Sequence, residues 1–339
     1  MTLPATPANH IEHPFAEFVR TIGRGKRSRR DFTYEEAKQS FEMILDGHAT
    51  EAQVGAYLML LRVKEETPEE LAGFVEACRG WLAQHQPPLP TADIDWPSYA
   101  GKKKHHPWYL LSALLLADNQ HRIFMHGGAA HTHGRLYSDQ ALAQLGIPIA
   151  SSIEQAATQL DQNAFCYLGL DIMCPQLDDL LSMRYQLGLR SPVNTLTRCM
   201  NPTGAPVSLQ SVFHPAYITL QRGAAEILQE QRLTLFKGEG GEIELRPDAD
   251  TKLFGLQKEK RSEVRWPASM ARQTPPGDAS VEPLKALWRG DENDAGRYGK
   301  HAVIGTAAVV LFTAGLADDQ AVAMDIAEEY WRKRNKDRI

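Results

Sequence analysis

Cysteine is scarce in this chain, and its pattern excludes two classes of protein. The four cysteines, Cys78, Cys166, Cys174 and Cys199, do not have the spacing of zinc ligands. Scattered cysteines of this kind fit a reducing compartment and not a disulfide scaffold. The first residues also lack a basic start followed by an apolar core, so we expect no signal peptide and a cytoplasmic protein.

Long apolar runs and an excess of positive charge are missing as well. The longest apolar run, 302–317, contains two threonines and is shorter than the roughly 20 residues that cross a bilayer, which predicts a buried helix and no membrane partner. The net charge is −5, so the chain as a whole is not a basic nucleic-acid binder. Any surface for DNA or RNA must therefore be a local concentration of positive charge.

A glycine-rich loop is missing where an α/β protein that binds phosphate would carry one. Such loops need small residues, because backbone N–H groups must approach the phosphate oxygens. Here the segment Tyr99–His106 reads YAGKKKHH, and Gly101 is its single glycine. Pro107 and the bulky run Trp108–Leu111 follow. The position that should cradle a small phosphate is therefore positively charged and crowded.

Three helices are predicted near the N-terminus. Thr33 stands three residues before Glu36 in the capping-box pattern of a helix start, and Thr50 stands three residues before Gln53 in the same way. The third helix is predicted from Thr67-Pro68-Glu69-Glu70, which offers a cap, a proline in the first turn and acids near the positive end of the dipole. The segment 86–90, QPPLP, predicts a linker after them. We therefore expect a basic arm over 1–31, a helical domain over 32–86 and an α/β domain over 91–339.

Strand-like segments alternate with helices in the rest of the chain. Arg122–Met125, Ala164–Leu168 and Leu233–Phe236 are short and apolar, and glycines follow each of them. This alternation is typical of an α/β domain. Ligands of such domains usually bind in the loops at the strand ends, so we expect the functional site there.

Two stretches carry a resemblance to a known family. They are the helical opening, FTYEEAKQSFEMILDGHATEAQVGAYLMLLRVKEETPEELAGFVEACR, and Leu187–Pro202, LGLRSPVNTLTRCMNP. The chain resembles the anthranilate phosphoribosyltransferases over Phe32–Trp331. The resemblance implies a small N-terminal α-helical domain joined to a larger α/β domain, a fold shared with pyrimidine nucleoside phosphorylases. It also implies a homodimer formed through the helical domain, to which the region 174–200 would add a further helix.

The motifs by which that family binds its donor, 5-phosphoribosyl-1-pyrophosphate, are altered here. Tyr99–His106 replaces a GTGGD-type loop, and Met125–Gly128 replaces a Lys-His-Gly-Asn motif. Ile243 and Glu244 stand where the family has a metal-binding Asp-Glu pair, and the loss of one carboxylate weakens a magnesium site. We therefore predict no catalytic residue, no metal site, no cofactor and no phosphoribosyl transfer. The remnants of the family site are Gly101, His126, Gly127, Asn194 and Glu244.

Cations are gained around the same cleft. The motif SYAGKKK followed by PWYLL resembles the YbiB-type branch of the family, which implies binding of DNA and RNA with little sequence preference. Contacts to phosphates carry no sequence information, so the lack of a base-reading motif agrees with this. Our main prediction is a homodimer that binds nucleic-acid phosphates in a basic groove lined by Arg24, Lys26, Arg27, Arg29, Lys102, Lys103, Lys104, Arg135, Arg184, Arg190 and Arg198.

The residues leave other interpretations open. The chain could instead be an enzyme, either a glycosyl- or phosphoribosyltransferase with an unknown acceptor or a nucleoside phosphorylase, or it could be a ligand sensor or scaffold. Trp108 and Tyr109 could stack on bases or fill a core. His131 and His133, together with His126, could hold zinc or could be polar loop residues. The lysine triplet could also be ordinary solvated surface.

Overall fold

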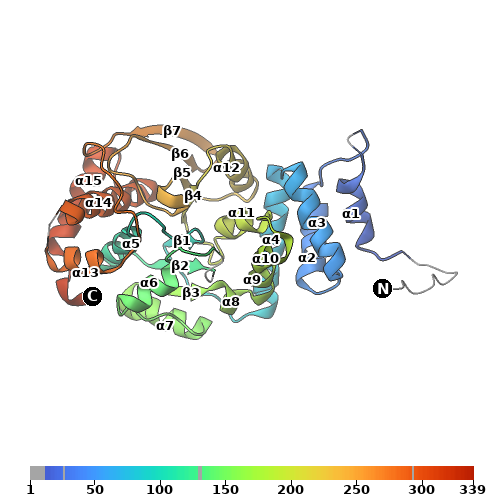
Figure 1. Ribbon diagram of the computed structural model, residues 1–339, viewed down its shortest axis with the longest axis horizontal. Helices are drawn as coiled ribbons and strands as arrows, with labels where there is room; N and C mark the ends of the chain where they lie inside the picture. The colour runs from blue at the N-terminus through green and yellow to red at the C-terminus, as the bar shows by residue number, and fades with distance from the viewer. Residues whose placement is uncertain (1–11, 26, 129–131, 292–293) are drawn as a thin grey trace.

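The computed structural model describes residues 12–25, 27–128, 132–291 and 294–339, which form a small helical part and a larger α/β part (Figure 1). The three helix starts predicted at Thr33, Thr50 and Thr67 are present, and each of these threonines forms a capping box. One helix precedes them within the basic N-terminal stretch. The four helices are α1 (Ala16–Gly23), α2 (Tyr34–Leu45), α3 (Glu51–Lys64) and α4 (Pro68–His85).

Short helices from the middle of the chain lie against this bundle (Figure 1). Leu177 and Val193 share one hydrophobic core with Leu71 and Phe74 of α4. The region 174–200 is therefore packed into the helical part, although it follows the first strands of the sheet in sequence. The short helix α8 (Leu170–Met173) precedes this region, whose elements are α9 (Pro175–Ser182), α10 (Arg184–Leu187), α11 (Val193–Leu196) and the short helix η1 (Thr197–Cys199).

Within the described residues, seven strands form one sheet in the order β3-β2-β1-β4-β5-β6-β7. Five strands are parallel, and the last two add an antiparallel edge. The carboxyl ends of parallel strands meet at one edge of the sheet, so the loops after β1, β2, β4 and β5 lie near one another. The strands are β1 (Ile94–Ser98), β2 (Ile123–Gly127), β3 (Phe165–Gly169), β4 (Val207–Val212), β5 (Arg232–Lys237), β6 (Thr251–Gln257) and β7 (Lys260–Trp266).

The remaining helices pack on the sheet and on one another (Figure 1). They are α5 (Tyr109–Asp118), α6 (Ser138–Gln144), α7 (Ile153–Asn163), α12 (Tyr217–Ile227), α13 (Glu282–Arg289), α14 (Asp294–Ala314) and α15 (Gln320–Lys333), with the short helices η2 (Glu239–Gly241) and η3 (Lys336–Arg338). The apolar run 302–317 forms most of α14, as predicted. In the part of the chain that the structure describes, no helix is long and apolar enough to cross a membrane.

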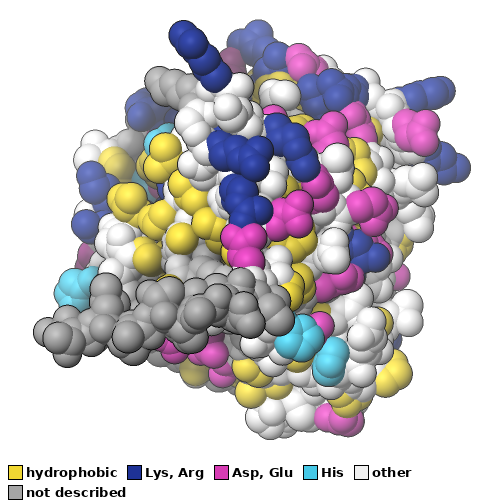
Figure 2. Space-filling view, turned by 90° about the vertical axis from the view of Figure 1, so that its right-hand side faces the viewer, with side chains coloured by type: hydrophobic (Ala, Val, Ile, Leu, Met, Phe, Trp, Pro, Cys, Tyr) yellow, Lys and Arg dark blue, Asp and Glu magenta, His cyan; other side chains and the backbone are white. Residues whose placement is uncertain are grey.

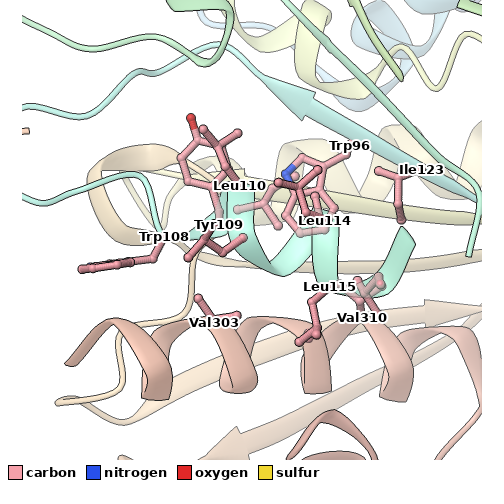
Figure 3. Packing of buried hydrophobic residues seen from close by; sticks show 14 of the residues in the cluster. Trp96, Trp108, Tyr109, Leu110, Leu114, Leu115, Ile123, Val303 and Val310 are labelled. Atoms are coloured by element: carbon pink, nitrogen blue, oxygen red, sulfur yellow. The ribbon is translucent and has the colours of Figure 1, made fainter. Parts of the chain in front are cut away.

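Helix α5 is buried between the sheet and α14 (Figure 3). Trp108 is 1% exposed and Tyr109 is fully buried, and both belong to the same core cluster as Val303 of α14. A helix that is apolar on every side is a core helix. The aromatic pair therefore fills the core, and the alternative that it stacks on bases is wrong.

Candidate functional site

The loop after β1 still forms an anion cradle, although it has lost most of its glycines. The backbone N–H groups of Ala100 and Gly101 both donate to Oε1 of Glu242, each at 2.6 Å. The hydroxyl of Ser98 donates to Oε2 of the same carboxylate at 2.8 Å. Glu242 is fully buried. Convergent backbone donors of this kind bind phosphate in many α/β proteins, and here the chain fills them with its own carboxylate.

Lys102 is not part of an open groove, contrary to the prediction. Its Nζ atom lies 2.7 Å from Oε1 of Glu244 and 3.0 Å from the backbone oxygen of Glu239. The backbone N–H of Tyr109 donates to Oε2 of Glu244 at 2.9 Å. Burial raises the pKa of Glu244 to about 7, although Lys102 opposes this shift. The lysine therefore supplies the positive charge beside the remnant of the metal-binding pair, while Ile243 is buried in the core.

The rest of the basic loop divides between surface and core. Lys103 and Lys104 are exposed, as a groove would require. His105 and His106 are buried, and His105 stacks on Tyr298 with ring centroids 5.5 Å apart. Two of the three lysines of this loop therefore have side chains at the surface, and their binding of nucleic acid stays a prediction.

His126 and Gly127 lie inside the sheet, where they serve packing. Nδ1 of His126 is 2.8 Å from the hydroxyl of Tyr99, and Nε2 is 3.1 Å from Oδ1 of Asp95. A Cβ atom on Gly127 would lie 2.4 Å from the backbone oxygen of Ser98, so only glycine fits there. These two remnants of the family motif hold β1 and β2 together.

The zinc alternative finds no support in the described residues. His131 lies outside them, and His126 is already hydrogen-bonded through both ring nitrogens. Among the residues that the structure describes, no group of three His, Cys, Asp or Glu side chains could hold a metal ion. His133 is exposed to solvent.

Four of the predicted arginines lie near one another: Arg135 in the loop after β2, and Arg184, Arg190 and Arg198 along the short helices α10 to η1. Burial lowers the pKa of Arg190, and the nearby guanidinium groups of Arg184, Arg135 and Arg198 lower it further. Within the described residues, no carboxylate lies within 4.0 Å of Arg135, Arg190 or Arg198. We call these four residues the arginine cluster. Positive charges gathered in this way are typical of a site for an anionic ligand.

Two members of the arginine cluster also hold loops in place. Nη1 of Arg135 donates to the backbone oxygens of Ala100 and Gly101 at 3.0 and 2.9 Å. Nη1 of Arg198 donates to the backbone oxygen of Gly241 at 2.8 Å. Each guanidinium has five N–H groups, so both residues keep further donors for a ligand. Arg198 is more buried than the sequence suggested, whereas Arg190 is exposed.

A cavity of about 160 Å³ opens beside the arginine cluster, between the helical part and the end of β4. Asn194, the last of the family remnants, lines it and accepts a hydrogen bond from the backbone N–H of Ser191 at 3.2 Å. Sequence reasoning missed several of its other residues, because they lie in ordinary helix and loop segments. They are Arg62, Phe213, His214 and Gln221.

The basic N-terminal segment lies away from this cleft. Arg24, Arg27 and Arg29 are exposed between α1 and α2, whereas Lys26 lies outside the described residues. In Figure 1 this segment is at the outer edge of the molecule, and α3 separates it from α10 and α11. Viewed from that end, Lys and Arg side chains are mixed with Asp and Glu (Figure 2). One chain therefore does not join the arm and the arginine cluster into a single groove.

Comparison with known proteins identifies the family. The chain belongs to a glycosyl transferase family, because residues 19–80 match its helical bundle domain and residues 109–333 match its a/b domain. The fold expected from the sequence is confirmed. The anthranilate phosphoribosyltransferase of Thermus thermophilus has a TM-score of 0.74 at 20% identity, over 94% of both chains. The Saccharomyces cerevisiae enzyme in complex with PRPP and Mg has a TM-score of 0.73 at 14% identity, over 94% of this chain and 93% of that one.

The relatives by sequence belong to two groups. The uncharacterized protein YbiB of Escherichia coli is 30% identical over 207 residues, which are 60% of this chain and 64% of that protein. The anthranilate phosphoribosyltransferase of Desulfitobacterium hafniense (strain Y51) is 30% identical over 200 residues, 58% of each chain. These two matches span less than two thirds of the relatives, whereas the enzyme of Metallosphaera sedula matches at 28% over 310 residues, 88% of each chain.

These comparisons bear on the two functional interpretations unequally. They support a phosphoribosyltransferase-like member of a transferase family. This agrees with the enzyme alternative at the level of the family. None of the relatives and solved structures named above is described as binding nucleic acid. The choice of function therefore depends on the chemistry of the site in this chain.

Proposed function

We propose that this chain binds the phosphodiester backbone of nucleic acid through its arginine cluster, as a cytoplasmic homodimer, and does not transfer phosphoribosyl groups. One observation carries the proposal. The carboxylate of Glu242 takes the backbone donors of the loop after β1. Arg190 and Arg198 of the arginine cluster line an open cavity beside it, together with Arg62 and with Glu66, whose pKa is raised by burial.

A phosphoribosyl donor finds little to bind in this arrangement. A pyrophosphate carries several negative charges and needs backbone donors and magnesium for binding and departure. The donors are taken by Glu242, and Glu244 is paired with Lys102. Bringing the donor in would place its charge against a buried carboxylate, which is strongly unfavourable.

A phosphodiester chain, in contrast, suits the groups that remain. Guanidinium groups bind phosphate oxygens through paired hydrogen bonds, and Arg190 is exposed for this purpose. Lys103 and Lys104 lie on the surface of the adjacent loop and extend the positive charge. Contacts of this type do not read bases, so DNA and RNA of any sequence should bind.

Homodimerisation would add a second arginine cluster to the same assembly. Two clusters on one strand raise the overall affinity when the strand can reach both. The exposed arginines Arg24, Arg27 and Arg29 lie at the helical end, where the family resemblance places the dimer contact. In a dimer, Arg24, Arg27 and Arg29 of one chain would extend the positive surface at the arginine cluster of the partner chain.

The enzyme alternative is favoured by a different observation. Most of the relatives named above are anthranilate phosphoribosyltransferases, and the cavity lined by Arg62, Arg190 and Asn194 is open. If the chain binds the donor, 5-phosphoribosyl-1-pyrophosphate with magnesium should raise its unfolding temperature. Our proposal expects no such shift.

The test of nucleic-acid binding is a salt series by fluorescence anisotropy. Wild type should bind single strands and duplexes of two unrelated sequences, with affinity falling steeply as salt rises. Arg190→Ala should weaken binding to all of them alike and reduce the slope of log affinity against log salt by about 0.7 to 0.9. The matched control is Lys260→Ala, an exposed cation on the β6–β7 hairpin. Binding that is absent in wild type, or unchanged in Arg190→Ala, would contradict the proposal.

A further inference from the structure

The cavity beside Arg190 has the size of one aromatic ring. Its volume is about 160 Å³, and a cavity of about 150 Å³ in another protein holds a benzene molecule. It lies between Arg62 of α3 and the residues that end β4. Arg190 and Arg198 also line it, so a phosphate bound to Arg190 would lie beside this space.

Phe213 stands at the mouth of the cavity and is 53% exposed. A Cβ atom on Gly241 would lie 3.6 Å from the Cβ of Phe213, and the backbone oxygen of Gly241 accepts from Arg198. The exposed ring is therefore next to the arginine cluster. His214 packs edge-on against Phe213, with ring centroids 4.8 Å apart, and limits the directions that the phenyl ring can take.

Gln221 lines the same cavity from α12 and is 2% exposed. Its Oε1 atom has no hydrogen-bond partner among the described residues. A buried acceptor without a donor is costly, and native proteins seldom leave one unless a ligand or water completes it. A planar ring that carries an N–H group would donate a hydrogen bond to Oε1 of Gln221 and would also fill the cavity.

We propose that this cavity takes one unpaired base of a single-stranded nucleic acid, whose phosphate lies on Arg190. The inference rests on the proposed function and adds to it a preference for single strands. The base would stack on Phe213 and offer an amino or imino N–H to Gln221. Stacking on an aromatic side chain accepts every base, so sequence preference should stay small. Bases of a duplex are paired and stacked, so a duplex reaches only the arginine cluster.

The experiment compares a single strand with the duplex of the same sequence in wild type and in Phe213→Ala. Stacking of one base on an aromatic side chain corresponds to a loss of affinity of roughly 5- to 150-fold on its removal. We expect this loss for the single strand and less than about a twofold change for the duplex. The matched control is Leu316→Ala, since Leu316 is 51% exposed, follows α14 and does not line the cavity. A strand that carries the fluorescent base 2-aminopurine should change its emission on binding to wild type and not to Phe213→Ala.

The outcomes separate the inference from the function on which it rests. If wild type binds neither form, the proposed function has failed. A second outcome is that wild type binds both forms while Phe213→Ala keeps its affinity for both, or loses the same affinity for both. In either case the arginine cluster alone binds the nucleic acid, and the inference of a base site is wrong. If a small aromatic acid stabilises wild type and displaces no nucleic acid, the cavity has a different occupant, which also overturns the inference.

Discussion

The Nζ atom of Lys102 and the Oε1 atom of Glu244 lie 2.7 Å apart in a buried pair, with side chains 1% and 0% exposed. Lys102 comes from the loop after β1, and Glu244 follows η2. The pair neutralises the carboxylate of Glu244, which the family resemblance places at the Glu position of a metal-binding pair. It therefore fixes the basic loop against the sheet and does not present it to a ligand.

Breaking this pair should cost far more than removing a surface lysine. Lys102→Met leaves the carboxylate of Glu244 buried without its cation, which typically destabilises a protein by about 3 to 5 kcal/mol. Lys102→Met/Glu244→Gln should recover most of this loss, because the glutamine oxygen still accepts from the backbone N–H of Tyr109. Urea unfolding of wild type, single and double variants measures the difference. Lys103→Met, at an exposed position, should change little.

The free energy of unfolding of the same variants should depend on pH in different ways. Burial raises the pKa of Glu244 in the folded protein, and loss of Lys102 removes a group that opposes the shift. An acid whose pKa is raised in the folded state holds a proton that the unfolded chain releases, so stability falls as pH rises. The stability gap between Lys102→Met and Lys102→Met/Glu244→Gln should therefore widen from about pH 5 to about pH 8. A constant gap would mean that Glu244 does not titrate in this range.

Removal of Glu242 should open the anion cradle. In Glu242→Ala the N–H groups of Ala100 and Gly101 lose their acceptor, so inorganic diphosphate should bind and raise the unfolding temperature. A ligand at 100 times its dissociation constant adds about 2.7 kcal/mol of stability. Wild type and the exposed control Glu328→Ala should gain less, because in them diphosphate can reach the arginine cluster but not the cradle. Equal stabilisation of all three proteins would place the diphosphate elsewhere.

The protein should be a homodimer at micromolar concentration. Val63 at the end of α3 is 75% exposed, and the helical end of the molecule shows a hydrophobic area beside its charged groups (Figure 2). Apolar area of this kind often marks a protein–protein interface. Light scattering coupled to size exclusion should give twice the chain mass of 37.8 kDa. A monomer mass would remove both the dimer and the shared groove from the account.

Local signals in the sequence predicted much of the fold. The capping boxes at Thr33, Thr50 and Thr67 depend on residues three apart, so they can be read directly. The placement of Arg184, Arg190 and Arg198 near the cleft was expected from the family resemblance, because the three lie along one helical stretch. The larger arrangement came from the family resemblance and not from the residues alone.

The burial of Lys102 against Glu244 could not be predicted, because the two residues are distant in sequence. Lys102 reads as one of three surface lysines, yet its acceptor Glu244 is 142 residues away. A backbone bridge between Lys102 and Leu136 turns the lysine inward. Phe213 gave no signal either, since one aromatic residue after a strand usually packs in a core.

The central claim is that this family site is closed to the phosphoribosyl donor while its arginine cluster is open to nucleic acid. The most direct measurement is isothermal titration calorimetry on one sample of the wild-type protein. The sample is titrated first with 5-phosphoribosyl-1-pyrophosphate and magnesium, and then with a single-stranded oligonucleotide. We expect no binding heat in the first titration and saturable binding in the second. Saturable binding of the donor with one molecule per chain, followed by no response to the oligonucleotide, would contradict the account.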